Sequence, residues 1–68
     1  MYGERLRKIR KERKVPQKVL ADLLGISVRG YQFYENEDAE PIISMLIALA
    51  DFYDVSIDYL VGRTDTPK

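Results

Sequence analysis

The chain has 68 residues, of which 46% are hydrophobic and 32% charged, and this composition predicts one folded domain near the lower size limit for a core without disulfides or metal. The absence of Cys and His excludes disulfides, thiolate nucleophiles, zinc fingers and imidazole bases. The formal net charge is zero, but residues 1–29 carry nine Lys and Arg against three Asp and Glu, and residues 30–68 carry two against eight. This asymmetry favours a molecule that presents one face to a polyanion, although charges that only solvate the two halves give the same count.

The first predicted helix covers residues 2–13, where Tyr2, Leu6 and Ile9 recur at helical spacing among charged residues. Val15 and Pro16 end it, because the residue before a proline is pushed out of the helical region while proline suits the start of the next helix. A second helix is predicted over residues 17–24, with Gly25 able to close it in a left-handed conformation. Its buried side chains are drawn from Val19, Leu20, Ala21, Leu23 and Leu24.

Ser27 is placed to cap a third helix over residues 28–35, after a turn of about three residues. Pro41 is expected to open a fourth helix that runs to residue 53. Its inner face is predicted to carry Ile43, Leu46, Leu49 and Ala50. Ile42, Met45 and Ile47 lie beyond that stripe, which suggests that something outside the domain covers part of the helix.

Ser56 is predicted to cap a short fifth helix over residues 57–60, and Gly62 to close it before a frayed tail at residues 63–68. The first residues form no apolar signal segment. The longest apolar run, IISMLIALA, is far shorter than the roughly 20 residues that span a bilayer. We therefore expect a single soluble, cytoplasmic domain over residues 1–68 that does not enter a membrane.

Residues 17–35 combine a helix, a glycine-containing turn and a second helix, which is the helix-turn-helix pattern whose second helix enters the DNA major groove. The chain also resembles the Cro/phage-repressor type of helix-turn-helix regulators (the XRE family) from about Glu4 to Asp65, through ERLRKIRKERKV, QKVLADLLGIS, YQFYEN and ALADFYDVSIDYLVGRTD. The resemblance implies an all-α, lambda-repressor-like domain of five short helices. It also implies a bacterial or phage transcriptional regulator, most often a repressor, that binds a near-palindromic operator as a homodimer.

The resemblance implies which positions of the third helix face inward, and so which of its three aromatic rings are buried and which is exposed. Tyr31 and Tyr34 match inward positions. Residues facing base edges are then Val28, Arg29, Gln32 and Phe33. Arg29 can pair with guanine acceptors, Gln32 with adenine or phosphate, and Val28 or Phe33 can contact a thymine methyl group. The plainer alternatives are that Arg29 is a solvated surface arginine and that Phe33 packs against a neighbour.

The resemblance also assigns roles outside the base-facing side. Gln17 matches a position that anchors a DNA phosphate, and Lys18 and Ser27 are placed with it against the DNA backbone. Arg10 and Glu35 match a structural ion pair that joins the first helix to the end of the third. A dimer surface is expected at the outer side of the fourth helix together with Ile57, Tyr59 and Val61, unless those side chains only complete the core.

Two departures from the family pattern bear on DNA binding. Pro16 stands where the family offers a hydroxyl or amide cap for the second helix. The segment NEDAEP replaces glycine and basic residues, and its carboxylates weaken binding unless they turn away from the duplex. The carboxylates in or beside it are Glu35, Glu37, Asp38 and Glu40.

The alternative function is a protein-interaction module on the same scaffold, such as a partner regulator or an antitoxin-like protein, with weak DNA binding. An enzyme is not predicted, because the sequence has no nucleophile and base pattern and no phosphate-cradling loop. The acidic loop lacks the glycine and ligand spacing of a calcium site, and neither a metal nor a cofactor is expected.

Overall fold

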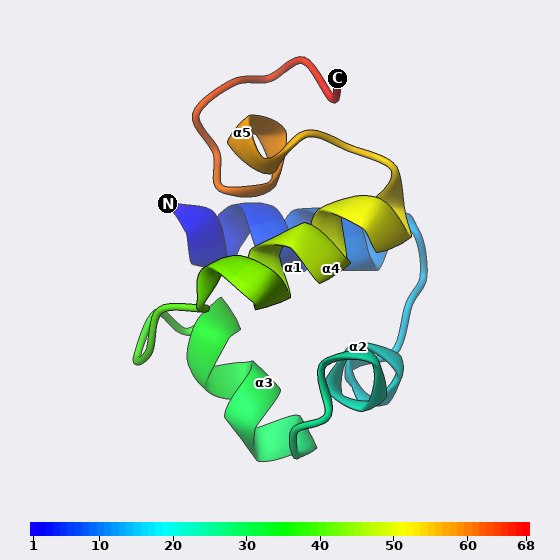
Figure 1. The fold of residues 1–68 in the computed structure, drawn as a ribbon, viewed down its shortest axis with the longest axis vertical. Coiled ribbons are helices and arrows are strands. Elements are labelled where there is room, and N and C mark those ends of the chain that lie inside the picture. Colours follow the sequence, from blue (N-terminus) through cyan, green and yellow to red (C-terminus); the bar gives the residue numbers. More distant parts are fainter.

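The computed structural model describes residues 1–68 and contains five helices and no strand, as predicted. They are α1 (Tyr2–Glu12), α2 (Gln17–Leu24), α3 (Val28–Glu35), α4 (Ile43–Tyr53) and α5 (Ile57–Leu60). In Figure 1, α1 crosses the middle of the molecule behind α4, with α5 and the C-terminal tail on one side and α2 and α3 on the other. None of the five has both the length and the apolar character that a membrane-crossing helix requires.

The ends of α2, α3 and α5 lie where local sequence signals place them. No side chain caps α2, whose N-cap is Pro16, and the helix ends at Gly25 with a left-handed φ of 70°. The Ser27 hydroxyl accepts a hydrogen bond from the backbone N–H of Gly30 at 3.0 Å, and Ser56 caps α5 in the same way. The turn between α2 and α3 is therefore fixed at both sides by its own residues.

The fourth helix differs from the prediction at its beginning. It starts at Ile43, because Ile42 remains extended and its carbonyl oxygen accepts the N–H groups of Met45 and Leu46. Ile43 was predicted on the inner face, but it is 69% exposed at the first turn of the helix. At the other end of the molecule, α1 stops at Glu12, one residue before the predicted end.

Both tyrosines of α3 that are predicted to face inward lie in or against the core. Tyr31 is fully buried and Tyr34 packs against the core from a half-buried position. The Tyr31 and Tyr53 hydroxyls are buried without a hydrogen-bond partner, so both rings contribute mainly apolar contacts. The buried apolar cluster comprises Leu6, Ile9, Leu20, Ala21, Tyr31, Leu49, Ala50, Tyr53, Val55, Tyr59 and Leu60.

A glycine allows α1 to approach the end of α3 closely. A Cβ atom at Gly3 would collide with the carbonyl oxygen of Glu35 and would lie 2.8 Å from Cγ of Glu37. Beside this contact, the Tyr2 hydroxyl donates a hydrogen bond to the carbonyl oxygen of Ala39 at 2.7 Å. The first turn of α1 is thus joined to the loop that follows α3.

The C-terminal tail, which the sequence predicts to fray, forms several hydrogen bonds with the body of the molecule. Nη1 of Arg5 donates hydrogen bonds to the carbonyl oxygens of Tyr59 at 2.7 Å and Thr64 at 2.8 Å. The backbone N–H of Ser56 donates to the carbonyl oxygen of Pro67 at 2.8 Å. These contacts join residues far apart in sequence, which a local composition argument does not capture.

Candidate nucleic-acid interface

The exposed side of α3 carries a cation and an aromatic ring next to each other. Phe33 is 39% exposed, and the guanidinium carbon of Arg29 lies 5.5 Å from the centre of its ring. Residues four apart share one face of a helix, and a guanidinium at this distance is attracted by the ring face. Both side chains thus point outward, as the sequence predicts for them.

The opposite side of α3 is held by a polar network that reaches three helices. Nε and Nη2 of Arg10 donate hydrogen bonds to the two carboxylate oxygens of Glu35, at 2.6 and 3.2 Å. Nε2 of Gln17 donates to Oε1 of Glu35 at 3.4 Å, and Nε2 of Gln32 donates to Oε1 of Gln17 at 3.0 Å. The ion pair between Arg10 and Glu35 that the resemblance implies is therefore present.

The charge state of this network follows from its geometry. Glu35 is only 4% exposed, and burial by itself raises the pKa of its carboxyl group. The hydrogen bonds and the positive charge of Arg10 are the main factors that outweigh burial, so the pKa of Glu35 lies below its ordinary value. The hydrogen bond to Glu35 in turn raises the pKa of Arg10. Both groups are charged at neutral pH, and each needs the other because a buried unpaired charge is costly.

The three residues predicted to contact the DNA backbone have different surroundings. Gln17 is half-buried at the first turn of α2, and its side chain forms hydrogen bonds with Glu35 and Gln32. Lys18 is exposed, with Nζ 3.0 Å from a carboxylate oxygen of Asp22 one turn further along α2. Ser27 is exposed, and its hydroxyl caps α3. The three mark the beginnings of α2 and α3, where backbone N–H groups and the helix dipole attract anions.

Two of the predicted site residues lie in or against the core. Val28 is half-buried and packs against the apolar cluster, since it precedes Tyr31 by three residues and shares its inward face. Tyr59, predicted in a dimer surface, is 9% exposed and lies beneath the guanidinium of Arg5 at 4.4 Å. Ile57 remains exposed and Val61 half-exposed.

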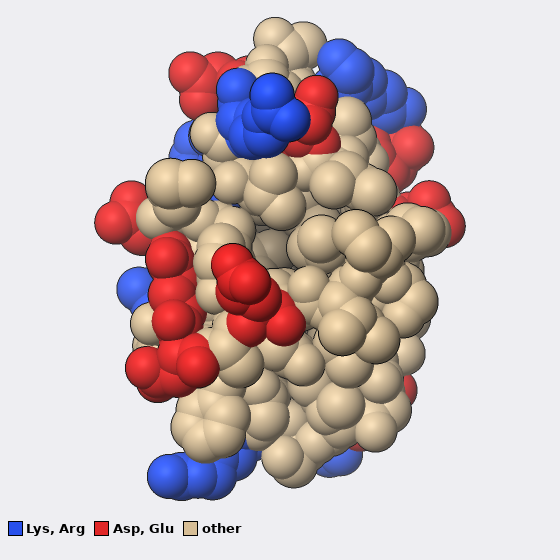
Figure 2. Space-filling model, turned by 60° about the vertical axis from the view of Figure 1, so that its left-hand side comes forward, with Lys and Arg blue, Asp and Glu red and all other residues tan.

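Two of the four carboxylates in or beside the loop after α3 are engaged in hydrogen bonds within the protein. Glu35 is buried, and Oε2 of Glu37 accepts hydrogen bonds from the backbone N–H of Gly3 at 3.0 Å and the amino group of Met1 at 2.8 Å. Those hydrogen bonds, that of the amino group first, lower the pKa of Glu37. Only Asp38 and Glu40 are exposed without such partners. Acidic side chains gather in the middle of the face shown in Figure 2, and Lys or Arg side chains lie at its lower end, where α3 begins.

Some basic side chains in and just after α1 form hydrogen bonds within the protein, which the sequence alone does not indicate. Nη2 of Arg7 donates to Oδ1 of Asn36 at 3.1 Å, and Nη1 of Arg13 donates to the carbonyl oxygen of Tyr53 at 3.1 Å. Lys8, Lys11 and Lys14 are exposed. No local pattern indicates which of these side chains is engaged, because every partner lies on another element.

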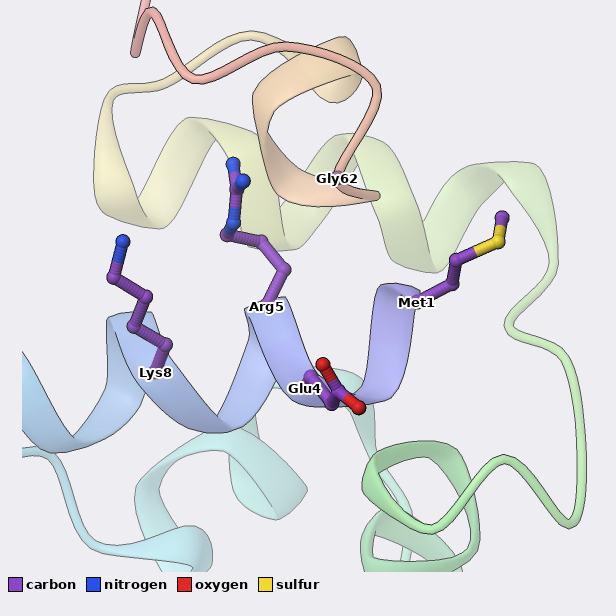
Figure 3. A pocket seen from close by; sticks show the side chains of 5 residues that line it. All are labelled: Met1, Glu4, Arg5, Lys8 and Gly62. Atoms are coloured by element: carbon purple, nitrogen blue, oxygen red, sulfur yellow. The ribbon is translucent and has the colours of Figure 1, made fainter.

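Other sites for a ligand are sparse. A shallow hollow of about 300 Å³ lies between α1 and the end of α5, lined by Met1, Glu4, Arg5, Lys8 and Gly62 (Figure 3). The guanidinium of Arg5 reaches across it to the tail, where its hydrogen bonds are already made. No three His, Cys, Asp or Glu side chains are arranged to hold a metal ion.

Comparisons with known proteins agree with this arrangement. A family model described as helix-turn-helix matches residues 6–60. The chain is 45% identical over 67 residues to the uncharacterized HTH-type transcriptional regulator YobD of Bacillus subtilis. The alignment covers 98% of this chain and 60% of YobD. It is 40% identical over 65 residues to the cryptic phage CTXphi transcriptional repressor RstR of Vibrio cholerae, covering 96% of this chain and 58% of RstR. The chain thus spans about three fifths of the length of these relatives.

Two solved structures share the fold closely. The P22 c2 repressor protein, crystallised in complex with a synthetic operator, matches with a TM-score of 0.83 and 33% identity, over 94% of this chain and 97% of the repressor. A transcriptional regulator from Listeria innocua matches with a TM-score of 0.87 and 34% identity, over 91% of this chain and 58% of that protein.

Proposed function

Because the chain belongs to the helix-turn-helix family, we propose that it is a sequence-specific DNA-binding transcriptional regulator, acting as a repressor with α3 in the major groove. The observation that carries this proposal is the outward side of α3, where Arg29 and Phe33 stand exposed on a helix whose other side is fixed to the core. Such a regulator acts on bacterial or phage DNA in the cytoplasm.

In the proposed complex, the two ends of the helix-turn-helix have separate tasks. Arg29, Phe33 and the free Oε1 of Gln32 contact base edges, while the first turn of α2 and the exposed amine of Lys18 contact phosphates. This division is supported by the missing side-chain cap on α2, which leaves its N-terminus open to an anion.

A homodimer would place two copies of α3 on half-sites about 34–36 Å apart, one helical turn along the duplex. The surface that supports pairing is apolar and lies outside the core. It comprises Ile42, Ile43 and Ile47 at the start and outer side of α4 with Ile57 and Val61 around α5. Beside the acidic side chains, Figure 2 shows a broad area free of charge, of the kind that marks a protein contact.

The test is selection from a random duplex pool by the purified protein at low and moderate salt, followed by sequencing of the bound fraction. We expect the wild-type protein to select a near-palindromic motif. In Arg29→Ala the base preference should weaken at one base pair of each half-site. The matched control Arg63→Ala changes an exposed arginine after α5 and should select the same motif as wild type. Salt-labile binding without any motif would contradict the proposal, because phosphate contacts alone give no sequence preference.

A second function has two observations in its favour. Asp38 and Glu40 are exposed beside α3, and an open hollow of about 330 Å³ between α2 and α4 is lined mainly by apolar side chains, including Leu23, Ile42 and Met45. These features suit a protein-interaction module that recognises a partner regulator or a toxin. A stoichiometric complex with a protein, formed without nucleic acid by a chain that selects no duplex motif, would support this alternative.

A further inference from the structure

Arg29 differs from the other arginines because its side chain has neither a hydrogen bond nor an ion pair within the protein. Of the six arginines in the chain, Arg5, Arg7, Arg10 and Arg13 donate hydrogen bonds to other elements, and Arg63 approaches Asp58 to 4.0 Å. The guanidinium carbon of Arg29 lies 5.5 Å from the centre of the Phe33 ring. All five N–H donors of this side chain are therefore available to an external acceptor while one face of the cation rests near the ring.

We propose that Arg29 and Phe33 act as one reading unit that recognises a guanine and a thymine in adjacent base pairs. This inference rests on the proposed DNA binding and specifies what the site reads. A guanidinium pairs with O6 and N7 of guanine, and an apolar side chain contacts the 5-methyl group of thymine. Successive base pairs lie about 3.4 Å apart along the duplex, so groups 5.5 Å apart on one helix face reach neighbouring pairs.

Phe33 has two tasks in this unit. Its exposed ring edge supplies the apolar contact to the methyl group, and its ring face positions the guanidinium before DNA arrives. A free arginine side chain loses rotamer freedom when it is immobilised, and a side chain already held in place loses less. Removing the ring should therefore weaken the recognition of guanine as well as that of thymine.

The experiment measures affinity for the selected operator carrying single base analogues. Uracil in place of thymine removes only the methyl group, and 7-deazaguanine in place of guanine removes only the N7 acceptor. We expect one thymine per half-site whose replacement weakens wild-type binding about fourfold, as for one buried methyl group, and a guanine in the adjacent base pair whose replacement weakens it about tenfold.

Two variants of one residue separate the tasks. Phe33→Leu keeps an apolar contact but loses the ring face, so it should still distinguish thymine from uracil while its sensitivity to 7-deazaguanine falls. Phe33→Ala should lose both sensitivities. Phe52→Leu, an exposed phenylalanine on α4, is the matched control and should behave as wild type.

The outcomes separate this inference from the proposed function. A selected motif whose thymines and guanines all tolerate the analogues would overturn the reading unit and leave DNA binding intact, as would a sensitive thymine and guanine that are not in adjacent pairs. Failure to select any motif would overturn both. If Phe33→Ala does not fold, the wild-type analogue measurements and Phe33→Leu still decide the question.

Discussion

The two sides of α3 use their polar side chains in opposite ways. On the inward side, Glu35 accepts hydrogen bonds from Arg10 of α1 and Gln17 of α2 and is almost completely buried. On the outward side, the Arg29 side chain makes no hydrogen bond to the protein, and its guanidinium lies over the ring of Phe33. Gln32 lies between them, with Nε2 bonded to Gln17.

This difference shows how a domain of this size can fix one helix and still leave it able to bind. The inward network determines the orientation of α3 relative to α1 and α2, because each of its hydrogen bonds joins α3 to another helix. The outward residues contribute little to that orientation, so their chemistry is available for recognition. Substitutions on the inward side should therefore change stability, and those on the outward side should change binding.

The largest effect is expected when the inward network is broken. Glu35→Gln leaves the guanidinium of Arg10, whose side chain is 14% exposed, without its carboxylate. We expect the free energy of unfolding to fall by about 3–5 kcal/mol, as for other buried pairs that lose one partner. Urea denaturation followed by circular dichroism measures this. The matched control Asp58→Asn removes a carboxylate from an exposed pair and should change stability by less than about 1 kcal/mol. Equal effects of the two substitutions would show that the network does not orient α3.

The same pair predicts how stability depends on pH. In the folded protein the pKa of Glu35 lies below its ordinary value of 4.5, so its ionised form stabilises the fold above that pH. This contribution is lost as the pH falls below 4.5 and through the lower pKa of the folded state. Urea midpoints between pH 6 and pH 3 should fall more steeply in wild type than in Glu35→Gln. Parallel curves would contradict the assignment.

A smaller loss is expected where α1 meets the end of α3. Gly3→Ala places a methyl group against the carbonyl oxygen of Glu35, and overpacking of this kind costs about 1–3 kcal/mol. Gly30→Ala is the control on the outward half of α3. Its Cβ atom would lie 3.3 Å from the Ser27 hydroxyl, which can move slightly, and alanine favours the helix by about 1 kcal/mol. Thermal unfolding should show a clear decrease for Gly3→Ala and a change within about 1 kcal/mol for Gly30→Ala.

Local signals predicted much of the fold. Gly25, Ser27 and Ser56 act through hydrogen bonds or backbone angles within a few residues, and the ends of α2, α3 and α5 lie where these residues place them. The pairing of Arg10 with Glu35 spans 25 residues and came from the family resemblance, since no local rule connects them.

The sequence was least informative where two distant segments meet. The contact between Gly3 and the end of α3, and the hydrogen bond from Gly3 to Glu37 across 34 residues, leave no periodic pattern. The burial of Tyr59 has the same origin, because Arg5, which covers it, lies 54 residues away. For Val28 the sequence leaves both sides open, because a helix of two turns has a narrow exposed arc and an apolar residue at its edge fits either side.

The smallest effect concerns the loop after α3, where the comparison between inward and outward side chains continues. Asp38 and Glu40 are exposed, whereas Glu37 is bonded to the start of α1. If the proposed DNA binding is correct, the two exposed carboxylates repel phosphates near the end of α3. Their interaction is screened within about 8 Å at physiological salt, so Asp38→Asn and Glu40→Gln should each raise affinity only about twofold.

The direction of this effect is more informative than its size. Asp58→Asn makes the same change in net charge on α5, which lies at the opposite end of the molecule from the start of α3 (Figure 1). An equal gain from Asp58→Asn would mean that only net charge matters and that the loop is remote from the duplex. A gain confined to Asp38→Asn and Glu40→Gln, lost at high salt, would place the loop beside the DNA backbone. It would also give a reason for the internal partners of Glu35 and Glu37, since carboxylates engaged by donors of the protein repel a polyanion beside α3 less.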